Sequence, residues 1–434
     1  MEKCLMAGYG RECITPDFPV TLSGYGNDAQ RPAMGVEHDI YVTCIAVNNG
    51  EKTLLLYTMD SLAASEFLAN DLRAEMKKVC DIPSEQIYLA AIHSHSCPRT
   101  APGLGGEKYR AFFLEKAVIA GQAALADLAP AKMELAKGEA PEMAYVRHYE
   151  MADGTYAGIN YGDLKHCPIA GYAAECDNTL VLLRFVRENK TDILLMNFQA
   201  HPALSYQIGR HMISPCWVGR MRDRMEEKTG LLIAYYNGAS GNQITRTFLK
   251  PGEERKWYEF GWELADHALA LMETLSPIEG TEINNTHFLF EAKSNHAWDH
   301  MLKEANEVYD LWQTHGADAA DQLARSYGFS SRYQTWQIRA SVNRPESEIR
   351  EMNAFRIGPV GFTTGTYEMS STEGIYVRKN SPFDTTILLC GNSGYIPTSK
   401  AYDMRTYEGD TSPFVRGTAE KMAETYVEML KKVQ

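Results

Sequence analysis

The sequence feature that most constrains the fold of this chain is a series of short runs that are apolar almost throughout. Half-buried strands alternate apolar and polar residues, whereas strands that are buried on both faces read as continuous apolar runs. The series therefore predicts β-sheets that are covered on both sides. The runs lie at residues 41–47, 53–59, 86–92, 180–186, 192–198, 231–236, 357–362 and 386–390.

Helical patterns separate these runs along the chain. Strands and helices that interleave in this way are typical of an α/β (mixed α+β) fold. No internal repeat, low-complexity tract or Pro/Gly/Ser-rich linker divides the sequence, and the more polar residues 295–351 are interpreted as a helical excursion. We therefore predict a single large domain, residues 1–434, in which helices cover buried β-sheets. The helical patterns lie at residues 66–78, 111–128, 256–275, 301–327 and 418–432.

The composition and charge narrow the class of partner. Hydrophobic residues make up 44% of the chain and charged residues 23%, which is typical of a soluble globular protein. The net charge is −13, from 43 Lys and Arg against 56 Asp and Glu, whereas nucleic acids and anionic membranes are bound through basic surfaces. No run approaches the length of a membrane-spanning helix. We expect a small-molecule partner, no nucleic acid and no stable membrane anchoring; the oligomeric state stays open.

The cysteines and the N-terminus bear on the cellular compartment. The nine cysteines are an odd number and contain no Cys-x-x-Cys pair, which favours free, reduced thiols over a disulfide framework. The N-terminal residues include no apolar stretch of signal-peptide length. Both observations predict a cytoplasmic protein.

A His-x-His pair, His93 and His95, directly follows the apolar run at residues 86–92. In an extended strand, side chains two residues apart point to the same face, so both imidazoles are expected on one side. Neutral imidazole is the commonest protein ligand for zinc. The pair alone is a weak indication of a metal site, because most such pairs are surface or hydrogen-bonded histidines.

Polar side chains of suitable chemistry follow other apolar runs as well. In open α/β sheets, ligands bind outside the carboxyl ends of the strands, so side chains at these ends are expected to meet. Four of them have a structural alternative: a helix cap or a hydrogen bond within a turn for Asp60, a core histidine for His201, a plain turn for the loop, and a solvated carboxylate for Glu368. The side chains are Asp60, His201, the loop 237–242 (Asn-Gly-Ala-Ser-Gly-Asn), Glu368 and Tyr395.

Five motifs occur in order between residues 14 and 408. They are Ile-Thr-Pro at 14–16 with Leu-Ser-Gly-Tyr at 22–25, Ile-His-Ser-His-Ser-Cys-Pro at 92–98, Asn-Phe-Gln-Ala-His-Pro at 197–202, the loop 237–242, and Tyr-Ile-Pro-Thr at 395–398 with Tyr-Glu at 407–408. Together they resemble the motifs of the neutral/alkaline non-lysosomal ceramidase family. The chain is similar to the short bacterial relatives that consist of the catalytic domain alone, without the C-terminal immunoglobulin-like domain.

The resemblance implies a metal centre and a set of catalytic groups. Two imidazoles, a carboxylate and a metal-ionised phenol make a shell suited to a catalytic zinc ion. A guanidinium and a phenol can hold an oxyanion, and an imidazole can transfer a proton. The implied Zn²⁺ ligands are His93, His201, Glu368 and Tyr395, and the implied catalytic residues are His95, Arg147, Tyr407 and Asn242.

The loop at residues 241–245 departs from the family pattern. Asn242 stands where the family has an aspartate, and Ile244 falls near the position of a serine proposed as catalytic. The nearest hydroxyls, Ser240 and Thr245, are out of register with that serine. Direct attack by metal-activated water is therefore the simpler expectation, although a hydroxyl nucleophile stays open. A small or N-acyl amide is expected as the substrate rather than a sphingolipid.

Three functions follow from this reasoning. The leading hypothesis is a zinc-dependent hydrolase of a carbon–nitrogen bond in a linear amide, because zinc can lower the pKa of a water to about 7. The second keeps the zinc site but changes the bond, giving an esterase or lactonase. The third is a catalytically inactive relative that binds a ligand, which the altered loop at residues 241–245 favours.

Overall fold

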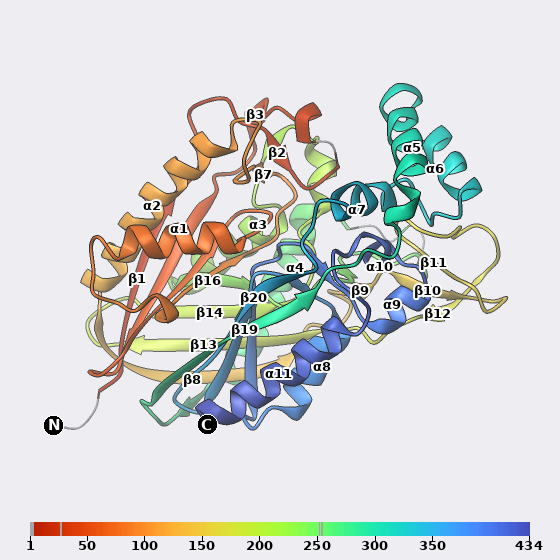
Figure 1. Ribbon diagram of the computed structural model, residues 1–434. Coiled ribbons are helices and arrows are strands. Elements are labelled where there is room, and N and C mark those ends of the chain that lie inside the picture. Colours follow the sequence, from red (N-terminus) through yellow and green to blue (C-terminus); the bar gives the residue numbers. More distant parts are fainter. Residues whose placement is uncertain (1–3, 27, 251, 253–254) are drawn as a thin grey trace.

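The computed structural model describes residues 4–26, 28–250, 252 and 255–434. It confirms the mixed α+β class, with sheets covered by helices (Figure 1). Within the described residues the larger sheet has nine strands, and a smaller sheet of four strands packs against it. Helices cover the outer face of each sheet, so the domain is built as four layers.

The strands of both sheets follow the apolar runs closely. The larger sheet has the order β16 (Leu232–Asn237), β14 (Ile193–Phe198), β13 (Thr179–Arg187), β8 (Ala129–Glu139), β1 (Met6–Cys13), β4 (Tyr41–Asn48), β5 (Thr53–Met59) and β6 (Ile87–Ala91), and β18 (Ser276–Ile278) pairs with β8. The smaller sheet has the order β19 (Ile283–Lys293), β20 (Ser347–Ile357), β21 (Val360–Gly365) and β23 (Thr385–Cys390).

The helices divide between the two outer faces and one projecting group. Helices α1 (Glu66–Met76), α2 (Gly106–Ala126), α3 (Trp217–Thr229) and α4 (Trp257–Met272) cover the larger sheet. Helices α8 (Ser371–Asn380) and α11 (Thr418–Val433) cover the smaller one. Helices α5 (Leu302–His315), α6 (Ala317–Ser326) and α7 (Gln334–Ser341) form the projecting group, and α9 (Ser399–Asp403) and α10 (Tyr407–Thr411) are short (Figure 1).

The core between the sheets explains why the runs are apolar throughout. On β5, Leu54 and Leu56 pack between the two sheets, whereas Leu55 packs under the helices of the outer layer, and all three are fully buried. Tyr88, Phe355 and Phe362 stack with ring centroids 4.5 and 4.7 Å apart, which joins the larger sheet to the smaller one. Both faces of a central strand are therefore apolar because both are covered.

Two predicted elements are wrong in detail. Residues 357–362 do not form one strand, because β20 ends at Ile357 and β21 begins at Val360 across a tight turn in which Gly358 has a φ of +54°. Residues 301–327 do not form one helix, because Gly316, with a φ of +88°, separates α5 from α6. In both places a glycine adopts a left-handed conformation that the surrounding pattern does not reveal.

The parallel strand pairs determine where polar side chains gather. β5 pairs with β6, β14 with β16, and β21 with β23, each in parallel. The carboxyl ends of a parallel pair lie at the same edge, so the loops that follow these strands are brought together. Among the described residues, no helix is long and apolar enough to cross a membrane.

Candidate active site

Three histidines from two strand ends converge at this edge. His93 and His95 follow β6, and His201 follows β14. Each offers one ring nitrogen, and these nitrogens all lie within 4.8 Å of one another. The ring of His93 is 4.5 Å from that of His201 and 4.9 Å from that of His95, centroid to centroid. The predicted meeting of the strand ends therefore brings these three histidines together.

The reason why His93 and His95 face each other differs from the prediction. β6 ends at Ala91, before the pair, and His93 has a φ of +71°, so the two residues do not lie on an extended strand. The chain turns at His93 and brings the two Nε2 atoms to 3.4 Å. Hydrogen bonds from Ser94 to Ser61 and Ser214 fix this turn. Such a left-handed non-glycine residue is strained and typical of functional sites.

Backbone carbonyls orient two of the imidazoles. His93 Nδ1 lies 2.7 Å from the oxygen of Leu62, and His201 Nδ1 lies 2.9 Å from the oxygens of Ser240 and Gln243. A carbonyl only accepts, so Nδ1 of each ring carries the hydrogen and Nε2 keeps its lone pair. This arrangement of a histidine held through its second nitrogen is typical of metal ligands.

The donor atoms fit a metal ion. Nε2 of His201 and Oε2 of Glu368 are buried and have no hydrogen-bond partner in the part of the chain that the structure describes. Glu368 Oε2 lies 3.3 Å from His93 Nε2 and 3.6 Å from His201 Nε2, so the three atoms point to a common centre. Buried polar atoms without partners are costly, and a cation between these donors would satisfy them together.

Glu368 and Tyr395 are positioned by a small parallel ladder. Strand β22 (Glu368–Met369) follows β21, and β24 (Tyr395–Ile396) follows β23, with Glu368 paired directly to Tyr395. Burial, together with the charge of Glu368, raises the pKa of Tyr395 well above its usual value. A phenolate at this position therefore requires a strong positive charge beside it, which a divalent cation supplies.

Arg147 lies beside Tyr395, with its guanidinium 5.5 Å from the centre of that ring, and is held by a buried carboxylate. Its backbone follows β9 (Tyr145–Val146), which pairs with β17 (Gln243–Ile244), and its side chain forms an ion pair with Glu408 and donates to the Gly241 oxygen at 2.8 Å. Burial opposes this charge, but Glu408 and Tyr395 raise the pKa of the guanidinium above its usual value. Arg147 is therefore a fixed cation.

The sequence did not reveal the roles of Glu408 and His148. Glu408 accepts from Arg147 and lies 3.2 Å from His148 Nε2. Burial alone would raise the pKa of Glu408, but the charges of Arg147 and His148 lower it to about 2. The Tyr-Glu motif at 407–408 marks the position of Glu408, whereas no local pattern distinguishes His148.

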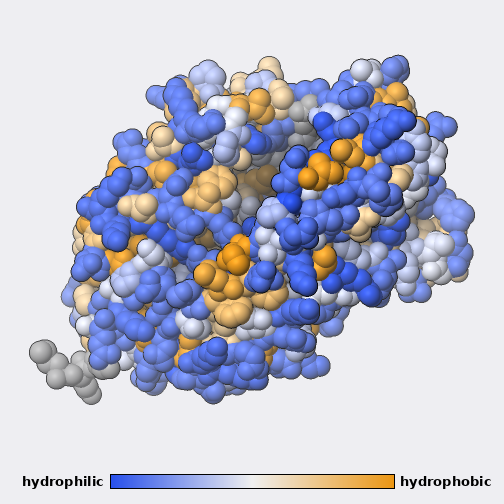
Figure 2. All heavy atoms as spheres, viewed as in Figure 1, coloured by the Kyte–Doolittle hydropathy of each residue, from blue (hydrophilic) through white to orange (hydrophobic). Residues whose placement is uncertain are grey.

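A cleft of about 610 Å³ opens onto these groups. His95, Arg147, His201, Tyr395 and Tyr407 all line it, so the structure brings these predicted site residues into one space. One wall is formed by Gly24, Tyr25, Gly26 and Asp28 near β2 (Leu22–Ser23), and another by α7 and the turn before it. The surface is visibly hollowed between these two walls (Figure 2).

The candidate hydroxyls of Ser240 and Thr245 and the loop residue Asn242 do not all lie in the cleft. Thr245 and Ile244 line the cleft. The Ser240 hydroxyl is buried and accepts from Asn237 Nδ2 at 2.8 Å. The Asn242 side chain accepts from the Ser371 amide at 2.8 Å, at the start of α8, and is not part of the cleft lining. Asn242 thus contacts the scaffold, and its predicted catalytic role stays a prediction.

Asp60 takes neither of the roles considered for it. Its carboxylate accepts from Arg222 at 2.8 and 3.1 Å and from the backbone amide of Tyr41, all in the protein interior. The helix cap at α1 is Ser65. Asp60 therefore anchors α3 to the larger sheet, because a buried carboxylate requires such a partner.

No family model and no curated protein matches the chain. Solved structures, in contrast, do match the chain. The neutral ceramidase from Pseudomonas aeruginosa matches 99% of this chain and 74% of its own, with a TM-score of 0.73 and 18% identity. A structure described as a ceramidase complexed with C2 matches 99% of this chain and 75% of its own, with a TM-score of 0.73 and 17% identity. The chain therefore has the neutral ceramidase fold over almost its entire length, as its motifs indicate.

Proposed function

We propose that this protein is a zinc-dependent hydrolase that cleaves the carbon–nitrogen bond of linear amides. The observation that carries the proposal is the convergence of His93, His201 and Glu368 on one point, with two buried donor atoms that lack partners. Tyr395 completes the proposed set of ligands because it is paired with Glu368. The shared ceramidase fold supports an amide as the substrate.

The protein supplies a different group for each requirement of amide hydrolysis. When bound, Zn²⁺ supplies a Lewis acid that polarises the amide carbonyl and lowers the pKa of water. His95 lies beside His93 and lines the cleft, so we assign it proton transfer to and from the reacting atoms. Arg147 and Tyr407 face the same space, and we assign them the stabilisation of the oxyanion.

The lining of the cleft favours water as the nucleophile. Ile244 has no nucleophilic atom, and the Ser240 hydroxyl is occupied by Asn237. Thr245 reaches the cleft but has no histidine or carboxylate among its recorded hydrogen-bond partners to act as a base, within the described residues. Activation of a hydroxyl normally requires such a neighbour. We therefore assign the role of nucleophile to water, and a metal held by His93, His201, Glu368 and Tyr395 would supply its activation.

The charge of the cleft narrows the substrate. Arg210 lines the cleft, and its guanidinium lies 5.5 Å from the centre of the Tyr25 ring. Arg147 and Arg332 also line it but are paired with Glu408 and Asp321, and the carboxylate of Asp28 is paired with Arg99 at 2.7 Å. Guanidinium groups bind carboxylates with good geometry. We therefore propose a small amide that carries a carboxylate near the scissile bond, such as an N-acyl amino acid.

Matched substrates test this function. Zinc-loaded protein is expected to hydrolyse N-octanoylglycine at least about tenfold better, in kcat/KM, than N-octanoylethanolamine, which has a hydroxymethyl group in place of the carboxylate. Turnover of O-octanoylglycolate without turnover of either amide would replace the amidase by an esterase. Stoichiometric zinc with no turnover of any of the three compounds would favour the inactive, ligand-binding alternative.

A further inference from the structure

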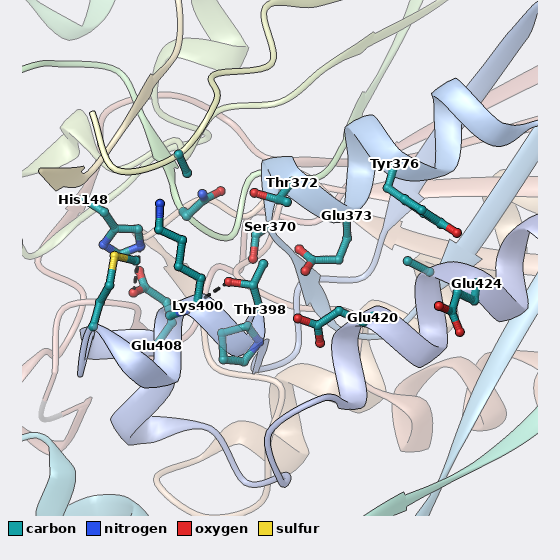
Figure 3. A pocket seen from close by; sticks show the side chains of 16 residues that line it. His148, Ser370, Thr372, Glu373, Tyr376, Thr398, Lys400, Glu408, Glu420 and Glu424 are labelled. Atoms are coloured by element: carbon teal, nitrogen blue, oxygen red, sulfur yellow. Dashed lines mark hydrogen bonds and ion pairs between the residues drawn. The ribbon is translucent and has the colours of Figure 1, made fainter. Parts of the chain in front are cut away.

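A second cavity, of about 280 Å³, lies behind the Arg147–Glu408 pair, between α8, α9, α10 and α11 (Figure 3). We call it the rear cavity. Glu408 and His148 form its wall on the side of the active cleft, and no residue lines both spaces. Its remaining walls combine carboxyl groups with apolar side chains, including Tyr376, Met404 and Ala423.

Glu373 is the central feature of the rear cavity. It is 4% exposed, and its Oε2 atom is buried without a hydrogen-bond partner. Figure 3 shows its carboxyl group directed into the cavity, toward Glu420. Glu373 is the third residue of α8, where a carboxylate stabilises a helix N-terminus. That role accounts for one carboxyl oxygen of Glu373, and the other oxygen faces the cavity.

A second carboxylate faces Glu373 from α11. Glu420 Oε1 accepts from the Ser399 amide at 2.6 Å, and Glu420 Oε2 is buried without a hydrogen-bond partner. Glu424 lies one turn further along α11, at the exposed rim of the cavity. Four carboxyl groups, those of Glu373, Glu408, Glu420 and Glu424, therefore line one small space. The Oε2 atoms of Glu373, Glu408 and Glu420 have no hydrogen-bond partner among the described residues, although Glu408 Oε2 lies 3.2 Å from His148 Nε2.

The basic groups of the cavity are engaged elsewhere. The Lys400 ammonium donates to the backbone oxygen of Ala173 at 2.6 Å, and His148 lies beside Glu408 at 3.2 Å. Burial, and after it the charge of Glu420, raises the pKa of Glu373 to about 8. Glu373 is therefore mostly protonated at neutral pH in the absence of a ligand, and a cation placed beside it would favour the ionised carboxylate.

We propose that the rear cavity binds a small organic cation, a primary ammonium group on an apolar body, with the ammonium between Glu373 and Glu420. An ammonium carries three donors and satisfies both orphaned oxygens with charge-assisted hydrogen bonds. Tyr376, Met404 and Ala423 offer an apolar surface for the rest of the ligand. The cavity is much larger than a metal ion, and Ca²⁺ requires six to eight oxygen ligands.

Calorimetric titration of the whole protein at neutral pH tests the proposal. Hexan-1-amine, which is protonated at this pH, is the probe, and hexan-1-ol is the control ligand of the same shape without the charge. We expect one bound hexylammonium per chain, with an affinity at least about tenfold higher than that of hexan-1-ol. The Glu373→Gln variant should lose about tenfold in affinity for the amine and little for the alcohol.

Glu428→Gln is the control, because Glu428 lies on α11, the helix that carries Glu420, is exposed and pairs with Lys431 outside the cavity. Its affinity for the amine should equal that of the wild type. If Glu373→Gln does not fold, Glu420→Gln tests the same prediction from the opposite wall. The readout is heat of binding, so its outcome does not depend on whether the active cleft hydrolyses amides.

Several results would overturn the proposal. Equal affinities for hexan-1-amine and hexan-1-ol would show that the cavity binds its ligand through apolar contacts alone. Amine binding that survives both Glu373→Gln and Glu420→Gln would place the amine elsewhere. If Ca²⁺ or Mg²⁺ gave a heat of binding that Glu373→Gln abolished, and the amine gave none, the rear cavity would be a metal site. No heat from the amine at about 10 mM would rule out the ammonium.

Discussion

Glu368 and Tyr395 are direct partners in the two-residue parallel ladder of β22 and β24, which continues the larger pairing of β21 with β23. The backbone hydrogen bonds of this ladder, and not side-chain packing alone, set the spacing of the two proposed metal ligands. His93 is fixed independently by its own turn and by the oxygen of Leu62. The donor set is therefore rigid before any ion binds, which favours high affinity.

Replacing His93 should remove the metal. We expect the wild-type protein to contain near-stoichiometric zinc and His93→Ala to lose both the zinc and the activity, because Nε2 of His93 is one of the converging donors. Elemental analysis of the purified variant measures this loss. His315→Ala, at an exposed helix end, serves as the control and should retain zinc. Undiminished zinc in His93→Ala would refute the ligand assignment.

Removing one hydroxyl tests the oxyanion assignment. Tyr407→Phe deletes only the phenol oxygen at the cleft, so kcat on N-octanoylglycine should fall by about 10²–10³ with zinc content unchanged. Tyr333→Phe is the control, since its ring lies 5.3 Å from that of Tyr407 in the same cleft. Equal turnover in wild type and Tyr407→Phe would exclude Tyr407 from the chemistry.

Glu408 should make stability depend on pH at the acid end. Its folded pKa of about 2 lies below its ordinary value of 4.5, so it stabilises the folded state above pH 4.5, and this contribution disappears as the pH falls toward 2. Glu408→Gln should lower the free energy of unfolding by about 3 kcal/mol at neutral pH. Denaturant melts at pH 7 and near pH 3 compare the two proteins, and a constant difference would contradict the assignment.

Glu373 should act in the opposite direction. Its folded pKa of about 8 lies above 4.5, so the folded state binds the extra proton and stability falls as the pH rises between these values. The Glu373→Gln variant has no titratable carboxyl group at this position, so it does not lose this stability as the pH rises. The variant should gain stability over the wild type by at most about 1.4 kcal/mol per pH unit from pH 5 to 8, then level off. Thermal melts across this range, without added amine, measure the gain, and parallel curves would refute it.

A glycine beside His95 offers a test of the geometry of the site. Gly24 has a φ of +116°, and a Cβ there would lie 2.7–2.8 Å from Cα, Cβ and Cγ of His95. Gly24→Ala should therefore displace His95 and lower kcat. Gly26 has a φ of +99° with open space around it, so Gly26→Ala carries the backbone strain without the contact. If both variants lose the same activity, the contact with His95 is unimportant.

The sequence predicts the buried strands well, because they depend on local pattern. The continuous runs identify β4, β5, β13, β14, β16 and β23 with small errors at their ends. The polar groups at their carboxyl ends then meet by the geometry of parallel pairing. His93, His201 and Glu368, however, follow strands of three different parallel pairs, so their meeting also depends on the docking of the two sheets.

What the sequence does not reveal depends on tertiary contacts. Strand β19 has mostly exposed side chains, so no apolar run marks it. The left-handed turn at His93 arises from hydrogen bonds between distant segments, and the pattern around it predicts an extended strand instead. Arg332 enters the cleft from the helical excursion, whose position over the site is a matter of tertiary packing.

The proposed metal ligands come from both sheets. His93 and His201 follow strands of the larger sheet, whereas Glu368 and Tyr395 follow strands of the smaller one. The centre therefore does not exist in either half of the β-sandwich alone, and it forms only after the two sheets have docked during folding. An ion bound there links the two sheets across their interface. Its binding free energy therefore adds to the free energy of unfolding of the domain.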